Sequence, residues 1–416
     1  MRAGPLLKCL WGLSLILLAL WIYSALWPRQ LAADASRYFD PLTLERSLRR
    51  AKLSYLNSGL ASVASLAVLY ALYRWSSKGP LLSHLVGAQF GPGRAALLGL
   101  GLGAGAALLF SLTGLPFGVY GYYLDRAFGL TPMRLPVYLL DYAKNTAFSV
   151  LQYAASGMFA AWAIVRFPRA WHWALTGSFL AASLLLNYLY PVVIAPAFNT
   201  FRPLEEGPAL QDVRELSAAA GMHVDRVLVM EASAKTSRAN AYFAGVGRTK
   251  QVVLYDTLLQ SHSREETRLV IAHELAHWRF GHLMKSVLLS SAAVLVSLLA
   301  FRSAILRSVS GAALSGGMHV LRNPTPLAIE RLLVLMFVFA TLTGFVLNPA
   351  SAYVSRRHER QADAYALALT GDAQAFTGSQ VRLATTNLAD VQPPPFIYWY
   401  AATHPSTLER ILSAAR

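Results

Sequence analysis

Long apolar segments alternate with shorter polar ones along most of the 416-residue chain. A helix rises about 1.5 Å per residue, so about 20 apolar residues cross the roughly 30 Å hydrocarbon layer of a membrane. Seven segments have this character, at residues 10–27, 57–73, 95–117, 145–166, 172–197, 284–301 and 328–349. The pattern predicts a mainly α-helical, polytopic membrane protein with seven transmembrane helices.

The first apolar segment allows a second interpretation. Arg2 and Lys8 precede it, and Ala33-Asp34-Ala35 resembles a cleavage site, as in a secretory signal peptide. Its apolar stretch is long, however, and Trp27 closes it as an aromatic residue at a membrane interface does. We therefore expect a retained helix, with a cleaved signal peptide as the alternative.

The apolar pattern is interrupted by a polar region after residue 197. Its periodicity predicts a helix at 209–220, a strand at 227–230, and two strands at 240–244 and 251–255. The last two are joined by a Gly-containing connection, which is typical of a hairpin. A small β-sheet is therefore expected beside the membrane helices.

Helix signals surround the sixth and seventh apolar segments. Ser263, with Glu266 three residues later, forms a capping-box pattern and predicts a helix start. The pattern then continues through Gly281 into the sixth segment, so we expect one continuous helix there. The Ser- and Gly-rich stretch 303–326 predicts a flexible connection between the last two spans.

Composition supports the membrane assignment and excludes other classes. Hydrophobic residues make up 55% of the chain and charged residues only 14%, which is rare in a soluble protein of this length.

The single cysteine, Cys9, excludes an intramolecular disulfide and a Cys-rich zinc site. The net charge of +16 collects beside the spans without interleaved aromatic residues, so we expect membrane lipid, and not nucleic acid, as the partner.

Lysine and arginine also predict the orientation in the membrane. With the C-terminus inside, the inner loops and the tail contain 26 of the 37 basic residues and the outer segments contain 10, while Arg331 lies in the last span. Basic residues accumulate on the cytoplasmic side of membrane proteins. The polar region after residue 197 and the C-terminal tail should therefore face the cytoplasm.

Residues 273–277 read His-Glu-Leu-Ala-His, an H-E-x-x-H motif. Positions i and i+4 of a helix are about 40° apart, so both imidazoles can bind one metal ion. Glu274 projects beside them, where a carboxylate can act as general base on water while the metal polarises a peptide carbonyl. The motif predicts zinc as the cofactor and peptide-bond hydrolysis without a covalent intermediate.

Two histidines leave the zinc short of a third protein ligand. Glu359 and Asp363 share one face of the helical stretch 355–366. One carboxylate can bind zinc and the other can accept the free N–H of a ligand imidazole. His282 would point about 140° from His277 on a continuous helix, and His358 lies about 100° from the face of Glu359. Both are therefore expected to be polar neighbours and not ligands.

The H-E-x-x-H motif is followed about eighty residues later by R-x-x-E-x-x-A-D, at Arg356 to Asp363. Together they resemble the membrane-integral CAAX prenyl protease 1 family of zinc metallopeptidases. Asn240-Ala241-Tyr242-Phe243 is similar to the substrate-strand segment of this family. His404-Pro405 with Arg410-Ile411 resembles its C-terminal H-P-x-x-x-x-R-I pattern, although Thr403 and Ser406 depart from the residues that usually flank it.

The resemblance implies a role for each matching residue. It implies zinc bound by His273, His277 and Glu359, with Glu274 as the general base and Asp363 behind a ligand histidine. It also implies stabilisation of the tetrahedral intermediate by His404, and substrate binding by Asn240, Ala241, Tyr242 and Arg410.

The resemblance further implies an enclosed chamber in the membrane and the removal of C-terminal residues from prenylated or similar peptides. The absence of a eukaryotic retrieval signal favours a bacterial inner (plasma) membrane. One alternative is a heat-shock-type quality-control metalloprotease, which has fewer spans. A non-enzymatic alternative is a seven-span transporter or receptor with a structural zinc site, which would not need Glu274 as a base.

These expectations divide the chain into four parts. They are spans one to five (1–197), a cytoplasmic zinc-peptidase segment (198–283), spans six and seven (284–349), and the C-terminal part of the peptidase domain (350–416).

Overall fold

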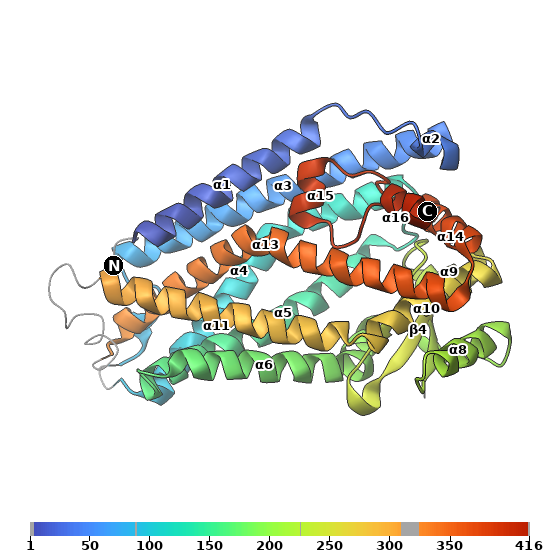
Figure 1. Cartoon of the computed structure of the whole chain (residues 1–416). Coiled ribbons are helices and arrows are strands. Elements are labelled where there is room, and N and C mark those ends of the chain that lie inside the picture. The colour runs from blue at the N-terminus through green and yellow to red at the C-terminus, as the bar shows by residue number, and fades with distance from the viewer. Residues whose placement is uncertain (1–3, 88–89, 225, 309–323, 415–416) are drawn as a thin grey trace.

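The computed structural model describes residues 4–87, 90–224, 226–308 and 324–414. Long helices form an elongated bundle, and a small sheet with several short helices lies at one end of it (Figure 1). The N-terminus lies at the opposite end of the bundle, and the C-terminus lies at the same end as the sheet.

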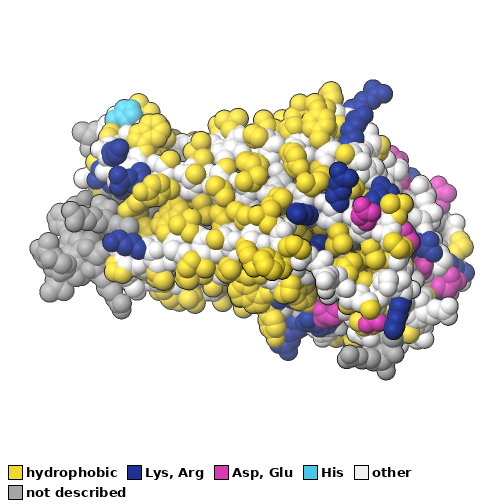
Figure 2. All heavy atoms as spheres, turned by 90° about the horizontal axis from the view of Figure 1, so that it is seen from above, with side chains coloured by type: hydrophobic (Ala, Val, Ile, Leu, Met, Phe, Trp, Pro, Cys, Tyr) yellow, Lys and Arg dark blue, Asp and Glu magenta, His cyan; other side chains and the backbone are white. Residues whose placement is uncertain are grey.

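Within the described residues, seven helices are long and apolar enough to cross a membrane. They are α1 (Pro5–Leu26), α3 (Pro41–Lys78), α4 (Pro92–Ala127), α5 (Leu135–Arg166), α6 with its continuation through η2 and α7 (Trp171–Phe198), α11 (His282–Ser308) and α13 (Pro326–Thr370). Figure 2 shows a broad hydrophobic surface along the bundle, with Asp and Glu side chains only toward the sheet end of the visible face. The predicted seven-span, mainly α-helical fold is confirmed.

The first and last spans both join the membrane core. Leu10 and Leu18 of α1 are buried together with Leu69 of α3 and Leu342 of α13. Helix α13 has 45 residues and continues through Pro349 without a break. At about 1.5 Å per residue it is about 68 Å long, roughly twice the hydrocarbon thickness. One helix therefore extends from the far end of the bundle to the sheet end.

Helices α4 and α5 touch through glycines. A Cβ atom added at Gly99 would lie 2.1 Å from the carbonyl oxygen of Gly157, and one added at Gly103 would lie 2.1 Å from that of Tyr153. No side chain fits at either position. Small residues allow the backbones of membrane helices to approach closely, and here they define how the two spans pack.

The helix that carries the H-E-x-x-H motif begins as predicted but ends earlier. Helix α10 (Arg264–Arg279) has Ser263 as N-cap, and the Ser263 and Glu266 side chains form the expected capping box. Gly281 has a φ of +63°, the left-handed conformation that ends helices, and α11 begins at His282. The prediction of one continuous helix through Gly281 is therefore wrong.

The sheet has four strands in the order β1-β2-β4-β3. They are β1 (Phe201–Pro203), β2 (Val227–Met230), β3 (Ala241–Ala244) and β4 (Gln251–Tyr255). Strands β2 and β4 pair in parallel, whereas the β1–β2 and β3–β4 pairs are antiparallel. The three predicted strands are confirmed, β1 was not predicted, and β3 is an edge strand.

Shorter helices surround the sheet and α10. They are α8 (Pro208–Ala219), α9 (Asp256–Ser261), α14 (Ala373–Asn387), α15 (Pro395–Ala401) and α16 (Thr407–Ala414), with α2 (Ala35–Tyr38) on the loop after the first span. Leu254 of β4 and Leu275 of α10 are fully buried in the core that they share. Most of the predicted flexible connection, residues 309–323, lies outside the described residues.

Candidate metal centre

Three side chains bring metal-binding atoms together where α10 meets α13. The Nε2 atoms of His273 and His277 lie 3.2 Å apart. Glu359 places one carboxylate oxygen 3.2 Å from Nε2 of His273 and the other 3.4 Å from Nε2 of His277. Ligands that lie about 2.0–2.1 Å from a tetrahedral zinc ion are about 3.3 Å apart, so the triangle has the size of a zinc site.

The chemistry of the three side chains fits a cation as well. Glu359 is buried, and the nitrogen atoms nearest its carboxylate are the Nε2 atoms of His273, His277 and His404. A buried carboxylate is costly unless a positive charge compensates it, and a cation held among these atoms would do so. Two imidazoles and one carboxylate are also a donor set that zinc uses in peptidases.

Asp363 and Arg410 support the first histidine. An Oδ1 oxygen of Asp363 lies 2.9 Å from Nδ1 of His273, on the side of the ring away from the triangle. Arg410 of α16 donates from Nε to the other carboxylate oxygen of Asp363 at 2.9 Å, and its Nη2 contacts Oδ1. A carboxylate at Nδ1 fixes the tautomer that leaves Nε2 free for a metal.

The surroundings shift the pKa values of the two histidines in opposite directions. For His273, burial favours the neutral ring, but the contacts with Asp363 and Glu359 outweigh it and raise the pKa to about 9. For His277, burial and the neighbouring His273 lower the pKa to about 4, which leaves the ring neutral. His273 would have to lose a proton at neutral pH before its Nε2 atom could hold a metal ion.

Glu274 lies between the metal-binding triangle and strand β3. Burial raises its pKa to about 7; the neighbouring His273 opposes the rise, and the carboxylate of Glu359 adds to it. The backbone of Phe243 in β3 forms a hydrogen bond with the carboxylate. A carboxyl group with a pKa near neutrality can both accept and return a proton.

The free edge of β3 faces this site. The carbonyl of Asn240 accepts from the N–H of Tyr255 in β4. Since backbone groups alternate along a strand, the N–H and C=O groups of Tyr242 also point toward β4, and those of Ala241 and Phe243 point away from it. Asn240 is exposed. The ring of Phe243 stacks on Trp278 of α10 with centroids 4.5 Å apart. The predicted substrate strand thus lies beside the metal-binding helix.

The C-terminal pattern contributes two residues in different ways. Nε2 of His404 lies 3.4 Å from Oε2 of Glu359, and its side chain is 60% exposed. The structure therefore brings His404 to the site. Arg410 forms the ion pair with Asp363 and is only 14% exposed. Its predicted contact with substrate stays a prediction, because the structure gives it a different partner.

His282 approaches the site more closely than predicted. Its Nδ1 atom lies 3.0 Å from Nδ1 of His277, and its Nε2 lies 3.1 Å from Oε1 of Gln361. The ring also stacks on His358, with centroids 4.1 Å apart. The angle of about 140° assumed an unbroken helix, so the turn at Gly281 invalidates it. The break was the signal that could have revealed this contact.

Two family models match most of the chain. Residues 203–416 match the model described as Peptidase family M48. Residues 43–200 match the model described as CAAX prenyl protease N-terminal, five membrane helices.

Individual proteins and one solved structure show the same relationship. A CAAX prenyl protease 1 homolog of Oryza sativa is 29% identical over 387 residues, which cover 88% of this chain and 84% of the relative. CAAX prenyl protease 1 of Saccharomyces cerevisiae is 30% identical, covering 73% and 69%. An uncharacterized metalloprotease of Bacillus subtilis is 30% identical, covering 74% and 71%. The crystal structure of S. mikatae Ste24p has the same fold, with a TM-score of 0.79, 23% identity and full coverage of both chains.

Fold, site and relatives together define a multi-pass integral-membrane metalloprotease, an enzyme that hydrolyses peptide bonds with a metal ion. The chain belongs to peptidase family M48, in the CAAX prenyl protease family. This membership does not favour the quality-control protease, or the transporter or receptor with a structural metal site.

Proposed function

We propose that the metal is a single zinc ion held by His273, His277 and Glu359. The observation that carries this proposal is the triangle of donor atoms 3.2–3.4 Å apart beside Glu274. When bound, zinc supplies Lewis acidity toward the scissile carbonyl and toward water. The remaining chemistry belongs to the side chains around it.

Glu274 acts as the general base and then as the acid. Its carboxylate takes a proton from the attacking water and returns it to the nitrogen of the leaving peptide, a role that a pKa near 7 suits in both directions. His404 donates a hydrogen bond to the carbonyl oxygen as negative charge develops on it. Asp363, held by Arg410, keeps His273 in the required tautomer.

Strand β3 binds the substrate backbone. An extended peptide adds to the free edge through the outward N–H and C=O groups of Ala241 and the C=O group of Phe243, because the N–H of Phe243 already donates to Glu274. Recognition through the main chain tolerates many side chains. Asn240 holds the peptide at the beginning of the strand with its exposed amide, and Tyr242 and the small Ala241 shape the surface beside it. The scissile bond then lies beside Glu274, at the Phe243 end of the strand.

The substrates proposed are prenylated peptides, or peptides of similar character, that lose their C-terminal residues. The relatives are named CAAX prenyl proteases, and the site lies at the end of an apolar bundle (Figure 1). A lipid chain on the substrate can stay among the apolar helices while the peptide reaches β3. We also propose the enclosed chamber in the membrane that would hold this lipid chain.

A pair of peptides with one sequence tests the substrate class. Purified protein in detergent should cleave the farnesylated peptide with a kcat/KM at least about tenfold above that of the unmodified peptide, since burying a lipid chain adds binding energy. Glu274→Gln serves as the inactive control. Equal values for both peptides would remove the prenyl requirement, and no cleavage of either would contradict the proposed substrate class.

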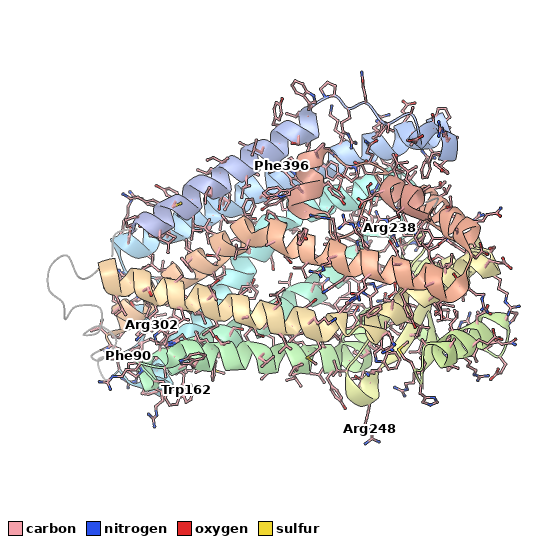
Figure 3. All side chains as sticks on the ribbon, in the orientation of Figure 1. Phe90, Trp162, Arg238, Arg248, Arg302 and Phe396 are labelled. Atoms are coloured by element: carbon pink, nitrogen blue, oxygen red, sulfur yellow. The ribbon has the colours of Figure 1, made fainter. Side chains whose placement is uncertain are left out.

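The site is proposed to face the cytoplasm, in a bacterial inner (plasma) membrane. Support comes from the 26 basic residues in the segments at the sheet end, against 10 in the outer segments. Figure 3 shows Arg248 projecting away from the body of the protein at the sheet end. In a Cys9→Ser background, Arg248→Cys should react with an impermeant maleimide in inside-out vesicles and not in intact cells. The reverse pattern would place the site outside.

A further inference from the structure

Residues 235–238, which precede β3, form hydrogen bonds and ion pairs with the membrane spans. Several of these hydrogen bonds are made with the turn between α4 and α5. The hydroxyl of Thr131 donates to the carbonyl of Lys235 at 2.6 Å, and the N–H of Ser237 donates to the carbonyl of Leu130 at 3.2 Å. The hydroxyls of Thr236 and Ser237 add further bonds to the backbone of the turn. These bonds join the membrane part of the chain directly to the peptidase part.

A shared carboxylate strengthens this junction. Nη2 of Arg238 lies 2.9 Å from both carboxylate oxygens of Asp125, at the end of α4. Arg50 of α3 donates to the same carboxylate at 2.9 and 3.2 Å. The Asp125 side chain is 25% exposed, so water screens these charge-assisted bonds only partly.

A second ion pair lies next to the first. The ammonium of Lys235 contacts Asp141 of α5 and the carbonyl of Phe198, where the fifth span ends. Spans α4 and α5, the turn between them and the end of the fifth span therefore all contact the short segment 235–238, and α3 supports Asp125 through Arg50. Figure 3 places Arg238 at the sheet end of the bundle, at the same end as α10.

This attachment matters because β3 is an edge strand. Its inner side pairs with β4, and its outer edge must stay free for a peptide. Asn240 follows Arg238 by only two residues, so a shift of the segment moves the start of the strand. At its other end, Phe243 is fixed to the catalytic helix by stacking on Trp278. Between segment 235–238 and the strand, the backbone N–H of Ala239 donates to Oδ1 of Asn387 in α14 at 3.0 Å, and the amide of Asn387 donates to the carbonyl of Ala239 at 3.2 Å. The start of the strand is thus held by the membrane spans and by α14, and its other end by α10.

We propose that the α4–α5 turn, with Asp125, is the element that aligns β3 with the metal site. The membrane domain then sets how the peptidase domain binds its substrate, beyond providing an anchor. Asp125, Arg238 and Thr131 are positioning residues that act through β3. This inference rests on the proposed role of β3 as the substrate strand.

The test compares Asp125→Ala with a matched control. In Glu206→Ala the lost carboxylate also accepts two bonds from one arginine, at 2.9 and 2.7 Å. This arginine, Arg214, lies in α8, and neither residue of the pair forms a hydrogen bond with segment 235–238. For the farnesylated peptide, Asp125→Ala should raise KM by about tenfold, with kcat within about twofold and zinc content unchanged. The control should keep wild-type values, and Asp125→Glu should recover most of the loss.

Three further experiments test the same contact, and one of them, hydrogen–deuterium exchange, does not depend on activity. Thr131→Val removes the hydrogen bond to Lys235 and the one that the Thr131 hydroxyl accepts from the N–H of Met133, but it leaves the Asp125 ion pairs in place, and it should raise KM by a smaller factor. Hydrogen–deuterium exchange of residues 235–244 in the substrate-free protein should become faster in Asp125→Ala and not in the control. Asp125→Ala combined with Arg238→Ala should be no worse than the more affected single variant, because both act through one contact.

The outcomes separate this inference from the proposed function. If Asn240→Ala raises KM while Asp125→Ala and Thr131→Val change neither KM nor exchange, the α4–α5 turn does not align the strand and the inference is overturned. If Asn240→Ala leaves KM unchanged, β3 is not the substrate strand. That result would contradict the proposed substrate-binding role of β3 and not the alignment by the α4–α5 turn.

Discussion

Nδ1 of His282 lies 3.0 Å from Nδ1 of His277, so the second histidine of the H-E-x-x-H motif has a histidine partner behind it. Gln361 places its amide oxygen, which can only accept, 3.1 Å from Nε2 of His282. The proton of the neutral His282 ring therefore lies on Nε2, and Nδ1 of His282 accepts a hydrogen bond from Nδ1–H of His277. This leaves Nε2 of His277 free for the metal. The left-handed turn at Gly281 makes this arrangement possible.

Removing His282 should weaken metal binding without removing a ligand. We expect His282→Ala to lower zinc affinity by about 10–100-fold, the usual effect of losing the group that orients a ligand histidine. Competition with a chromophoric chelator measures this affinity. His358→Ala is the control, because it removes a ring that stacks on His282 and leaves the hydrogen-bonded chain intact. An unchanged affinity in His282→Ala would contradict the orienting role.

Arg410 could either orient Asp363 or bind substrate, and one variant distinguishes these two roles. Its ion pair with Asp363 predicts that Arg410→Ala lowers zinc affinity by about tenfold, because Asp363 then holds His273 less firmly. Arg382→Ala removes a comparable ion pair, with Glu266, away from the metal and should not change the affinity. A raised KM with unchanged zinc affinity in Arg410→Ala would instead support the substrate contact predicted from sequence.

The glycine contact between α4 and α5 predicts a difference between two identical substitutions. Gly103→Ala places a Cβ atom 2.1 Å from the carbonyl oxygen of Tyr153, whereas Gly105→Ala on the same helix meets nothing within 4 Å. Overpacking of this kind costs about 1–3 kcal/mol, so Gly103→Ala should lower the unfolding temperature in detergent. Gly105→Ala should match or exceed the wild type. Equal unfolding temperatures for both variants would contradict the close approach.

Asp212 of α8 makes the stability of the peptidase part dependent on pH. Its side chain is 1% exposed; burial favours the neutral acid, but Arg264 and Arg268 outweigh this and hold the pKa below its usual range. A carboxyl group whose folded pKa is depressed stabilises the fold above its unfolded pKa of about 3.9 and loses that contribution as the pH falls through the folded value.

Asp212→Asn should therefore unfold at a lower temperature than the wild type from pH 5 to pH 8, by a stability difference of about 1–3 kcal/mol. The difference should begin to shrink below about pH 4, where Asp212 becomes protonated in the unfolded wild-type chain, and continue to shrink until the pH reaches the lower pKa of the folded protein. Thermal unfolding of both proteins across this range measures it. A difference that persists undiminished at pH 3 would contradict the assigned cause.

The parts of the fold that the sequence predicted are those governed by local pattern. The apolar segments predicted the spans because a helix in a membrane must be apolar along its whole length. The capping box at Ser263 and the H-E-x-x-H spacing are also local features, and α10 starts and presents its histidines as expected. Glu359 was found because a zinc site needs a third ligand.

The parts that were not predicted depend on contacts between distant segments. Nothing near residues 201–203 distinguishes β1, which exists because it pairs with β2. The break at Gly281 was hidden because a single glycine is tolerated inside a helix as well as at its end. Arg410 and Asp363 are 47 residues apart, and only the fold shows that they form an ion pair.

The central claim is that His273, His277 and Glu359 bind a catalytic zinc ion beside the base Glu274. Zinc content and peptide cleavage measured together for the wild type, Glu274→Gln and Glu359→Ala test it most directly. The wild type and Glu274→Gln should each hold about one zinc ion per chain, with cleavage reduced by about 10²–10⁴-fold in Glu274→Gln. Glu359→Ala should lose both zinc and cleavage. Full zinc occupancy in Glu359→Ala, or wild-type cleavage by Glu274→Gln, would contradict the claim.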